Sequence, residues 1–162
     1  MRRVRQFAAH LRARVAPEEE AFARAVLPPC AWPVFAGMPV ADRRHAIDVA
    51  DRLRTTGHDS PDLLAAALLH DAAKGRRMRL WHRVAGVLLE RLAPGLLRWL
   101  AAADPASWRH PFWLYLHHGP MSAELAARAG CTPATARLIR GVAGGEHEAR
   151  LLRALTAADD AS

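Results

Sequence analysis

A histidine followed directly by an aspartate, His70–Asp71, has the clearest capacity for chemistry in this chain. An imidazole nitrogen beside a carboxylate oxygen suits Mn, Fe, Co or Zn, and sites richer in carboxylates suit Mg. His45 lies upstream, and Lys74, which is the only lysine of the chain, follows the aspartate by three residues. Most isolated His-Asp pairs are better explained by a histidine that caps a helix and an aspartate in solvent. The combination with His45 and Lys74 favours a divalent metal site.

The stretch from Asp42 to Gly75 is predicted to form two amphipathic helices joined by a short turn, because its apolar residues recur at helical spacing. Asp42 stands at the N-cap position of the first helix and Gly57 at its C-terminal stop. His45 lies at the edge of the apolar face of that helix. In the second helix, the His-Asp pair and the lysine continue the apolar face that begins at Leu63. Polar groups in such a place must be paired in the core or must line a cavity.

A second carboxylate stands at the far end of the sequence. The final helix, predicted over residues 146–160, has leucines on its buried face, and Asp159 falls on that same face. Asp160 points about 100° away. An aspartate that continues an apolar face needs a partner, and a metal shared with His45 and His70–Asp71 would supply one. The alternative is a frayed and solvated helix end.

These residues resemble the HD superfamily of metal-dependent phosphohydrolases. The pattern of that family is a His, then His-Asp, then a distant Asp. Within Asp42–Gly75, the segments RRHAIDVA and LLAAALLHDAAKG are similar to the corresponding segments of that family. The resemblance implies that His45, His70, Asp71 and Asp159 hold a divalent cation.

The segment HHGPMSAELA, which begins at His117, resembles the His-Gly-Pro segment of bacterial HD hydrolases that split diadenosine tetraphosphate. Two adjacent histidines where Gly119–Pro120 should end a helix could ligate a cation, contact phosphate or only satisfy backbone groups. The resemblance implies that His118 binds metal. At a position about 18 residues before Asp159, where that subfamily has a further metal-binding His, this chain has Gly141. We therefore expect one firmly held metal, or a second that is held weakly.

The length and composition predict the fold class. With 162 residues, half of them apolar, few β-branched residues and no alternating pattern, the chain is expected to be a single all-α domain. The resemblance implies an HD-domain helical bundle over residues 41–162. A short helical N-terminal extension is predicted over residues 1–40, with a basic helix at residues 2–15. A further amphipathic helix is predicted at residues 80–93, which should bury Val84, Val87, Leu88 and Leu92.

The net charge of +7 is carried almost wholly by arginines, which are scattered over predicted helix faces rather than clustered. We therefore do not expect a nucleic-acid partner. The chain has no apolar run near the roughly 20 residues that span a bilayer, and its basic N-terminus lacks the pattern of a signal peptide. The expected location is cytoplasmic with no membrane partner, and a homo-oligomer is compatible with the sequence. Cys30 and Cys131 are far apart and show no CxxC spacing, so neither a disulfide nor a zinc site is indicated.

The leading functional hypothesis is hydrolysis of a nucleotide or another small phosphate ester by metal-activated water. In that hypothesis Asp71 also orients the water, and Lys74, with Arg44 as a weaker candidate, neutralises phosphate charge. His118 holds a second cation or protonates the leaving group. The alternative is a non-catalytic HD module that binds a nucleotide or a protein, with Gly141 marking a degenerate second site.

The segment SAELAARAGCTPATARLIRG resembles a helix-turn-helix DNA reader, which is a different class of function. In that interpretation the second helix starts at Thr132–Pro133. Its base-reading side chains would be Thr132, Ala134, Thr135 and Arg137, and the basic charge would bind phosphates. This hypothesis is the weaker one, because only Arg137 and Arg140 on the outer face could contact phosphate.

Overall fold

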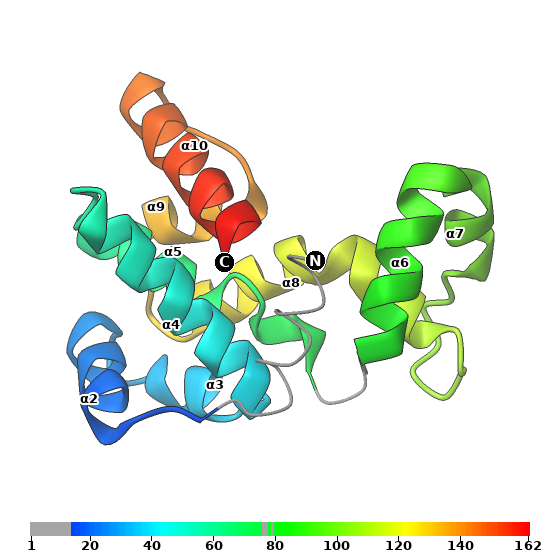
Figure 1. Cartoon of the computed structure of the whole chain (residues 1–162), viewed down its shortest axis with the longest axis horizontal. Helices are drawn as coiled ribbons and strands as arrows, with labels where there is room; N and C mark the ends of the chain where they lie inside the picture. The colour runs from blue at the N-terminus through cyan, green and yellow to red at the C-terminus, as the bar shows by residue number, and fades with distance from the viewer. Residues whose placement is uncertain (1–13, 76–77, 79) are drawn as a thin grey trace.

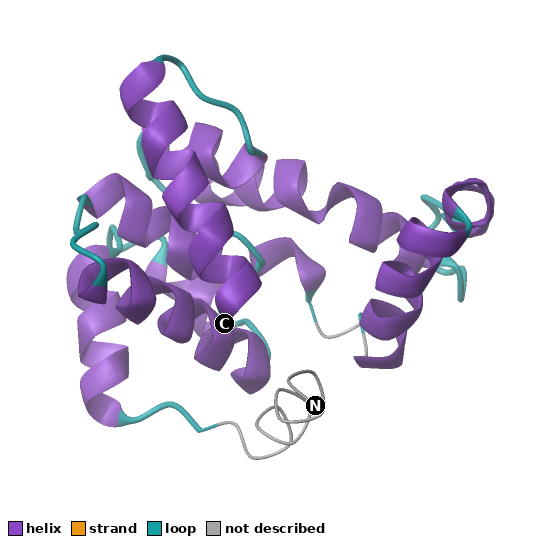
Figure 2. Cartoon of the chain, turned by 45° about the horizontal axis from the view of Figure 1, so that its top comes forward, coloured by secondary structure: helices purple, strands orange, loops and turns teal. Residues whose placement is uncertain are grey.

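The computed structural model describes residues 14–75, 78 and 80–162, so that nearly all of the helix predicted at residues 2–15 lies outside the described residues. The described residues fold into helices and contain no strand, which confirms the all-α prediction (Figure 2). In chain order the elements are α2 Pro17–Val26, α3 Trp32–Ala36, α4 Val40–Thr55, α5 Pro61–Leu69, the short 3₁₀ helix η1 Ala72–Lys74, α6 Leu80–Leu92, α7 Pro94–Leu100, α8 His110–Arg128, α9 Pro133–Arg140 and α10 Glu146–Ala161. None of the described helices is long and apolar enough to cross a membrane.

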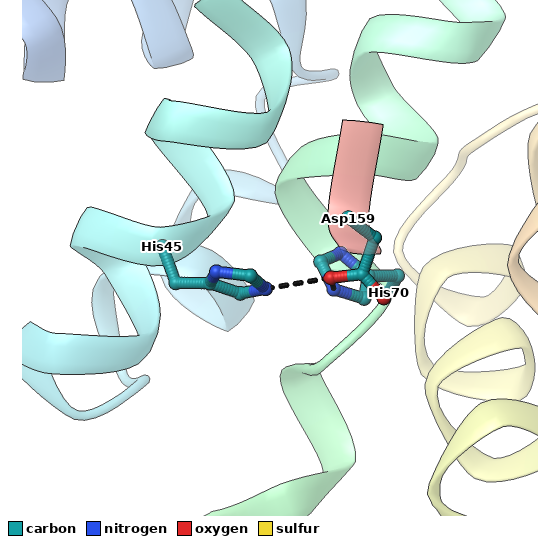
Figure 3. Close-up of side chains that lie close together, drawn as sticks. All are labelled: His45, His70 and Asp159. Atoms are coloured by element: carbon teal, nitrogen blue, oxygen red, sulfur yellow. Dashed lines mark hydrogen bonds and ion pairs between the residues drawn. The ribbon is translucent and has the colours of Figure 1, made fainter. Parts of the chain in front are cut away.

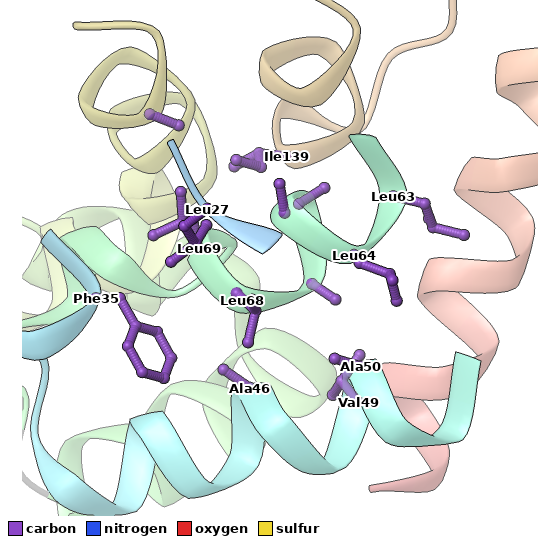
Figure 4. Packing of buried hydrophobic residues seen from close by; sticks show 14 of the residues in the cluster. Leu27, Phe35, Ala46, Val49, Ala50, Leu63, Leu64, Leu68, Leu69 and Ile139 are labelled. Atoms are coloured by element: carbon purple, nitrogen blue, oxygen red, sulfur yellow. The ribbon is translucent and has the colours of Figure 1, made fainter. Parts of the chain in front are cut away.

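Helix α5 is the centre of the bundle. Every residue from Leu63 to Leu69 is buried, and α4, α9, α10, α2, α3 and α8 all contact this helix. Helix α4 packs on it through the predicted apolar face, which includes Ala46, Val49 and Ala50 (Figure 4). Because α5 is covered on all sides, its C-terminal end delivers the next residues, beginning with His70, into the interior of the protein.

The segment before α4 shares this core. Ala23 and Leu27 at α2, and Phe35 and Met38 around α3, are buried in the same cluster as α4 and α5 (Figure 4). Proline sets the start of α2 at Pro17, because its fixed φ suits a first helical turn. Residues 17–38 therefore cover one side of the bundle and have no separate core.

Helix α8 does not end where the sequence predicted. It runs without a break from His110 to Arg128, with Pro120 inside it. Pro120 is exposed and lacks an N–H, so one helical hydrogen bond is lost there. The second half of the helix buries Ser122, Ala123 and Ala126 against α9 and η1. We attribute the continuity to this packing, which outweighs one missing hydrogen bond.

Helix α6 presents its apolar residues in a way that the periodicity did not predict. Val84, Leu88 and Leu92 are exposed by half or more, although the sequence analysis expected them to be buried. The buried face is instead formed by His82 and Gly86, which face α8. The periodicity correctly indicated an amphipathic helix, but it cannot tell whether the apolar face meets the protein core or another environment.

Asp42 is not the N-cap of α4. The helix begins two residues earlier at Val40, so Asp42 lies in its first turn, and its side chain is 1% exposed. Arg83 of α6 donates to Asp42 Oδ2 at 2.7 Å, which ties α6 to α4 across the molecule. The acidic residue at the helix start is therefore used for a tertiary contact.

We expect Asp42→Asn to lower the free energy of unfolding by roughly 2 kcal/mol, because Arg83 is left partly buried without its counter-charge. Urea unfolding followed by circular dichroism measures this change. The matched control is Asp48→Asn on the same helix, since the exposed Asp48–Arg44 pair should contribute no more than about 1 kcal/mol. Equal losses in the two variants would contradict the role assigned to the buried pair.

Candidate metal centre

Three side chains converge, and they come from α4, from the C-cap of α5 and from α10. His45 Nε2 lies 2.8 Å from Asp159 Oδ1, although the two residues are 114 positions apart in the sequence (Figure 3). His70 Nε2 lies 3.5 Å from the same carboxylate oxygen. One ligand atom from each residue lies within 4.8 Å of the others, so the group His45, His70 and Asp159 could hold a metal ion.

Each of the three residues is positioned by the helix that carries it. His45 lies on α4 next to the buried Ala46, and His70 is the C-cap residue of α5. Asp159 lies near the C-terminal end of α10, which packs on both α4 and α5. The side chain of Arg52 holds this end of α10 against α4, because it donates to Ala161 O at 3.1 Å and to Ser162 Oγ at 3.2 Å.

The protonated nitrogen of His70 is fixed by the backbone. His70 Nδ1 lies 2.8 Å from Ala67 O, so Nδ1 carries the hydrogen and donates it. The other nitrogen, Nε2, is buried and has no hydrogen-bond partner, and the same holds for Asp71 Oδ1, 3.6 Å away. Buried polar atoms without partners call for an explanation. A divalent cation would satisfy both atoms, and imidazole nitrogen with carboxylate oxygen is the donor set that Mn, Fe, Co and Zn accept.

Asp71 lies between two imidazoles and a lysine. Its carboxylate is 2% exposed, and Oδ2 accepts a hydrogen bond from Lys74 Nζ at 2.6 Å. Oδ1 lies 3.6 Å from the Nε2 atoms of both His70 and His118. His118 donates from Nδ1 to Tyr115 O at 2.8 Å, which leaves its Nε2 as an acceptor directed to Asp71. Asp71 is thus adjacent to the three-residue group and links it to His118.

The charges of the centre shift its pKa values in opposite directions. Burial lowers the pKa of His70, but the carboxylates of Asp71 and Asp159 outweigh burial and raise it to about 9. Burial would raise the pKa of Asp71, yet His70, Lys74 and His118 hold it well below its usual range. The pKa of Asp159 is lowered against burial by His45 and His70. Burial, followed by the charge of Lys74, lowers the pKa of His118. Both carboxylates are therefore ionised near neutral pH.

Metal binding should depend on pH through His70. Because its pKa is raised to about 9 in the metal-free protein, Nε2 is protonated at pH 7, and a metal ion must displace that proton. The apparent affinity for Mn²⁺ should rise about tenfold per pH unit from pH 6 to pH 8. Isothermal titration calorimetry in buffers of different ionisation enthalpy should give about one proton released per metal. A pH-independent affinity would contradict the assignment of His70 as a ligand.

The same shift sets the pH dependence of the metal-free fold. A His pKa that is higher in the folded than in the unfolded state stabilises the fold below about pH 6.5 and stops doing so as pH rises through about 9. The melting temperature of the metal-free protein should therefore fall over this interval.

Arg44, His147 and Gly141 lie outside the three-residue group. The guanidinium of Arg44 is bound by Glu19 and, at 2.8 Å, by Asp48. His147 is exposed at the start of α10, about 18 Å along the helix from Asp159. Gly141 is the C-cap of α9 at φ +79°, a conformation that favours glycine.

Two contacts that support the centre were not found from the sequence. Ser122 is buried in α8, and its Oγ accepts a hydrogen bond from Ala73 N at 3.0 Å, which docks η1 on α8. Arg52 supports the end of α10 as described above. Helical spacing was the available signal: Ser122 lies one turn after His118, and Arg52 lies two turns after His45.

The helices proposed for DNA reading are used inside the bundle. Thr135 is 1% exposed and lies 3.0 Å from Asp62 Oδ1, and Arg137 donates to both carboxylate oxygens of Glu148. Thr132 caps α9 by accepting from Thr135 N. In this arrangement Thr135 is not available to contact a base edge.

Comparisons of the chain with models of protein families, with curated proteins and with solved structures found no match.

Proposed function

We propose that this protein is an HD-type metal-dependent phosphohydrolase that acts on a nucleotide or another small phosphate ester. The observation that carries the proposal is the convergence of His45, His70 and Asp159, together with the unpartnered Nε2 of His70 and Oδ1 of Asp71. The order of these residues in the sequence, with a His, a His-Asp pair and a distant Asp, matches the pattern of the HD superfamily.

The proposed roles follow from the contacts. When bound by His45, His70, Asp71 and Asp159, a divalent cation would polarise a phosphoryl oxygen and lower the pKa of a water molecule. Asp71 would bind the cation through Oδ1, and the second lone pair of that oxygen would accept a hydrogen bond from the water, because Oδ2 already accepts one from Lys74. Lys74 would add positive charge where the phosphate becomes more negative during attack.

His118 fits the role of a ligand for a second, weakly held cation better than that of an acid. Burial and the neighbouring Lys74 lower its pKa, so the imidazole is neutral near pH 7 and its Nε2 can accept. A neutral imidazole ligates metal, whereas a general acid must carry a proton.

A non-catalytic HD module that binds a nucleotide or a protein partner is the second candidate. It is favoured by Gly141, which stands where the related hydrolases have a metal-binding His and which serves here to end α9. A site with one incomplete metal position could retain binding without turnover.

Metal analysis followed by an activity screen tests the proposal. The full chain, purified without chelator, should contain close to one equivalent of a transition metal. With added Mn²⁺ it should release phosphate from at least one member of a panel of nucleotides and phosphate esters. Asp71→Asn should abolish that activity, whereas Asp51→Asn, an exposed aspartate on α4, should leave it unchanged. Full metal occupancy without turnover on the whole panel would favour the binding module.

A further inference from the structure

An exposed apolar surface lies on helices α6 and α7 and the loop that follows, at the far end of α8 from α9 (Figure 1). Seven of the ten exposed large hydrophobic side chains among the described residues lie within residues 81–108. Their exposed fractions range from 45% to 80%. We call these seven residues the hairpin surface: Trp81, Val84, Leu88, Leu92, Leu96, Trp99 and Trp108.

The outward orientation of α6 is fixed by its packing on α8. Trp81, Val84, Leu88 and Leu92 are spaced by three, four and four residues, so they share one face of the helix. The other face is held close to α8, because a Cβ atom at Gly86 would lie 2.6 Å from the ring of Tyr115. Rotating α6 to bury its apolar stripe would bring larger side chains into this contact. The exposed stripe is therefore a stable feature of the fold.

The size of the hairpin surface indicates that it meets something other than water. Four of the seven side chains share one face of α6, and the seven together present on the order of 700 Å² of apolar area, whereas the largest apolar patch on a typical monomer is roughly 300–600 Å². Three of the five tryptophans of the chain belong to it. Tryptophan combines a large apolar body with a polar N–H and is enriched where an apolar phase meets water.

The charge around the hairpin surface favours an anionic bilayer over a second copy of this chain as its binding partner. Residues 80–109 contain four arginines and two acidic residues. Arg83 is paired with Asp42, whereas Arg91 and Arg98 are exposed and stand between residues of the hairpin surface in the sequence. Glu90 accepts a hydrogen bond from Tyr115, and Asp104 accepts one from the backbone of Ala106. The whole chain carries +7, so a second copy would bring the same sign of charge. Leucine, tryptophan and arginine together match the interface of an anionic bilayer.

We propose that the hairpin surface docks the protein onto a bilayer that contains anionic phospholipid, with α6 and α7 lying in the plane of the interface. Such a contact requires no spanning segment. The sequence-based expectation of no membrane partner rests on the lack of a spanning apolar run and of a signal-peptide pattern, and neither feature bears on a contact made by exposed side chains. This inference rests on surface residues alone and does not depend on the proposed hydrolase activity.

Vesicle flotation of the full chain tests the proposal. The protein should float with phosphatidylcholine vesicles that contain phosphatidylglycerol, and much less with pure phosphatidylcholine. The double variant Leu88→Gln/Leu92→Gln should reduce the bound fraction at least about tenfold, because two apolar side chains no longer enter the interface. The control Leu125→Gln/Val142→Gln changes two exposed apolar residues outside the hairpin surface and should bind as the parent protein does.

A separate double variant tests the contribution of the arginines to vesicle binding. Arg91→Gln/Arg98→Gln should weaken binding to anionic vesicles about tenfold at low salt, whereas Arg140→Gln/Arg153→Gln, two exposed arginines on α9 and α10, should have a smaller effect. Three outcomes would overturn the proposal: no flotation with anionic vesicles, equal binding to neutral and anionic vesicles, or a dimer in light scattering that Leu88→Gln/Leu92→Gln dissociates while no vesicle binding occurs.

Discussion

Asp159→Asn is expected to reduce metal affinity at least about 100-fold and metal-dependent phosphate release about 1000-fold. The carboxylate of Asp159 is the only group from α10 in the candidate site, and its Oδ1 faces both imidazoles, at 2.8 Å from His45 and 3.5 Å from His70. An amide has nearly the same shape but carries no negative charge, so the metal and the protonated His70 each lose one of their two carboxylate counter-charges and keep only that of Asp71. The affinity can be measured by competition with a fluorescent chelator.

Asp160→Asn is the matched control for this experiment. Asp160 is the next residue on the same helix turn, is exposed, and points about 100° away from Asp159. It should therefore keep the metal affinity and activity of the parent protein. If Asp159→Asn and Asp160→Asn behaved alike, the assignment of Asp159 as a ligand would be wrong.

His70→Ala should reduce activity as much as Asp159→Asn does, because it removes an imidazole ligand that faces both Asp71 and Asp159. Its Nε2 is buried, lies within 3.6 Å of both Asp71 and Asp159, and is held in place by the Nδ1 contact with Ala67. We expect about a 1000-fold loss of Mn²⁺-dependent turnover and at least about a 100-fold loss of metal affinity. Circular dichroism and thermal melting should show that the variant remains helical, because α5 is held by leucines and alanines.

The metal-free form of this variant adds an independent readout. Without the imidazolium of His70, the melting temperature should no longer fall between pH 6.5 and 9 in the way expected for the parent. His117→Ala serves as the control, because His117 is exposed and its ring stacks on Trp113 with centroids 4.4 Å apart. A parent-like pH dependence in His70→Ala would show that another group titrates.

Local sequence patterns predicted most of the bundle, because a helix that is buried on one side has apolar residues at regular helical spacing. The two helices within Asp42–Gly75 and the extent of α10 followed from the spacing of apolar residues. The proximity of His45 to Asp159 could not follow from spacing, since it depends on how α10 packs against α4. The apolar helix face indicated only that Asp159 needs a partner, and the family resemblance favoured a metal shared with His45 as that partner.

The failures of the sequence analysis concern long-range packing. Pro120 lies within α8 because tertiary contacts of the later turns compensate for a lost hydrogen bond, and no local pattern contains those contacts. Asp42 carried an N-cap signature but pairs with Arg83 from a helix 41 residues away. Arg44 looked free to meet phosphate, yet it is bound by Glu19 of α2. In each case the competing partner came from a distant element.

The separation of His45 and Asp159 along the chain has a consequence for metal exchange. A cation that binds both residues closes a loop of 114 residues and thereby acts as a reversible cross-link between α4 and α10. Release of the cation then requires the end of α10 to detach, so the dissociation rate should follow local opening of that helix. Amide hydrogen exchange in the last turns of α10 should slow on metal loading, while exchange in α6 and α7 stays unchanged.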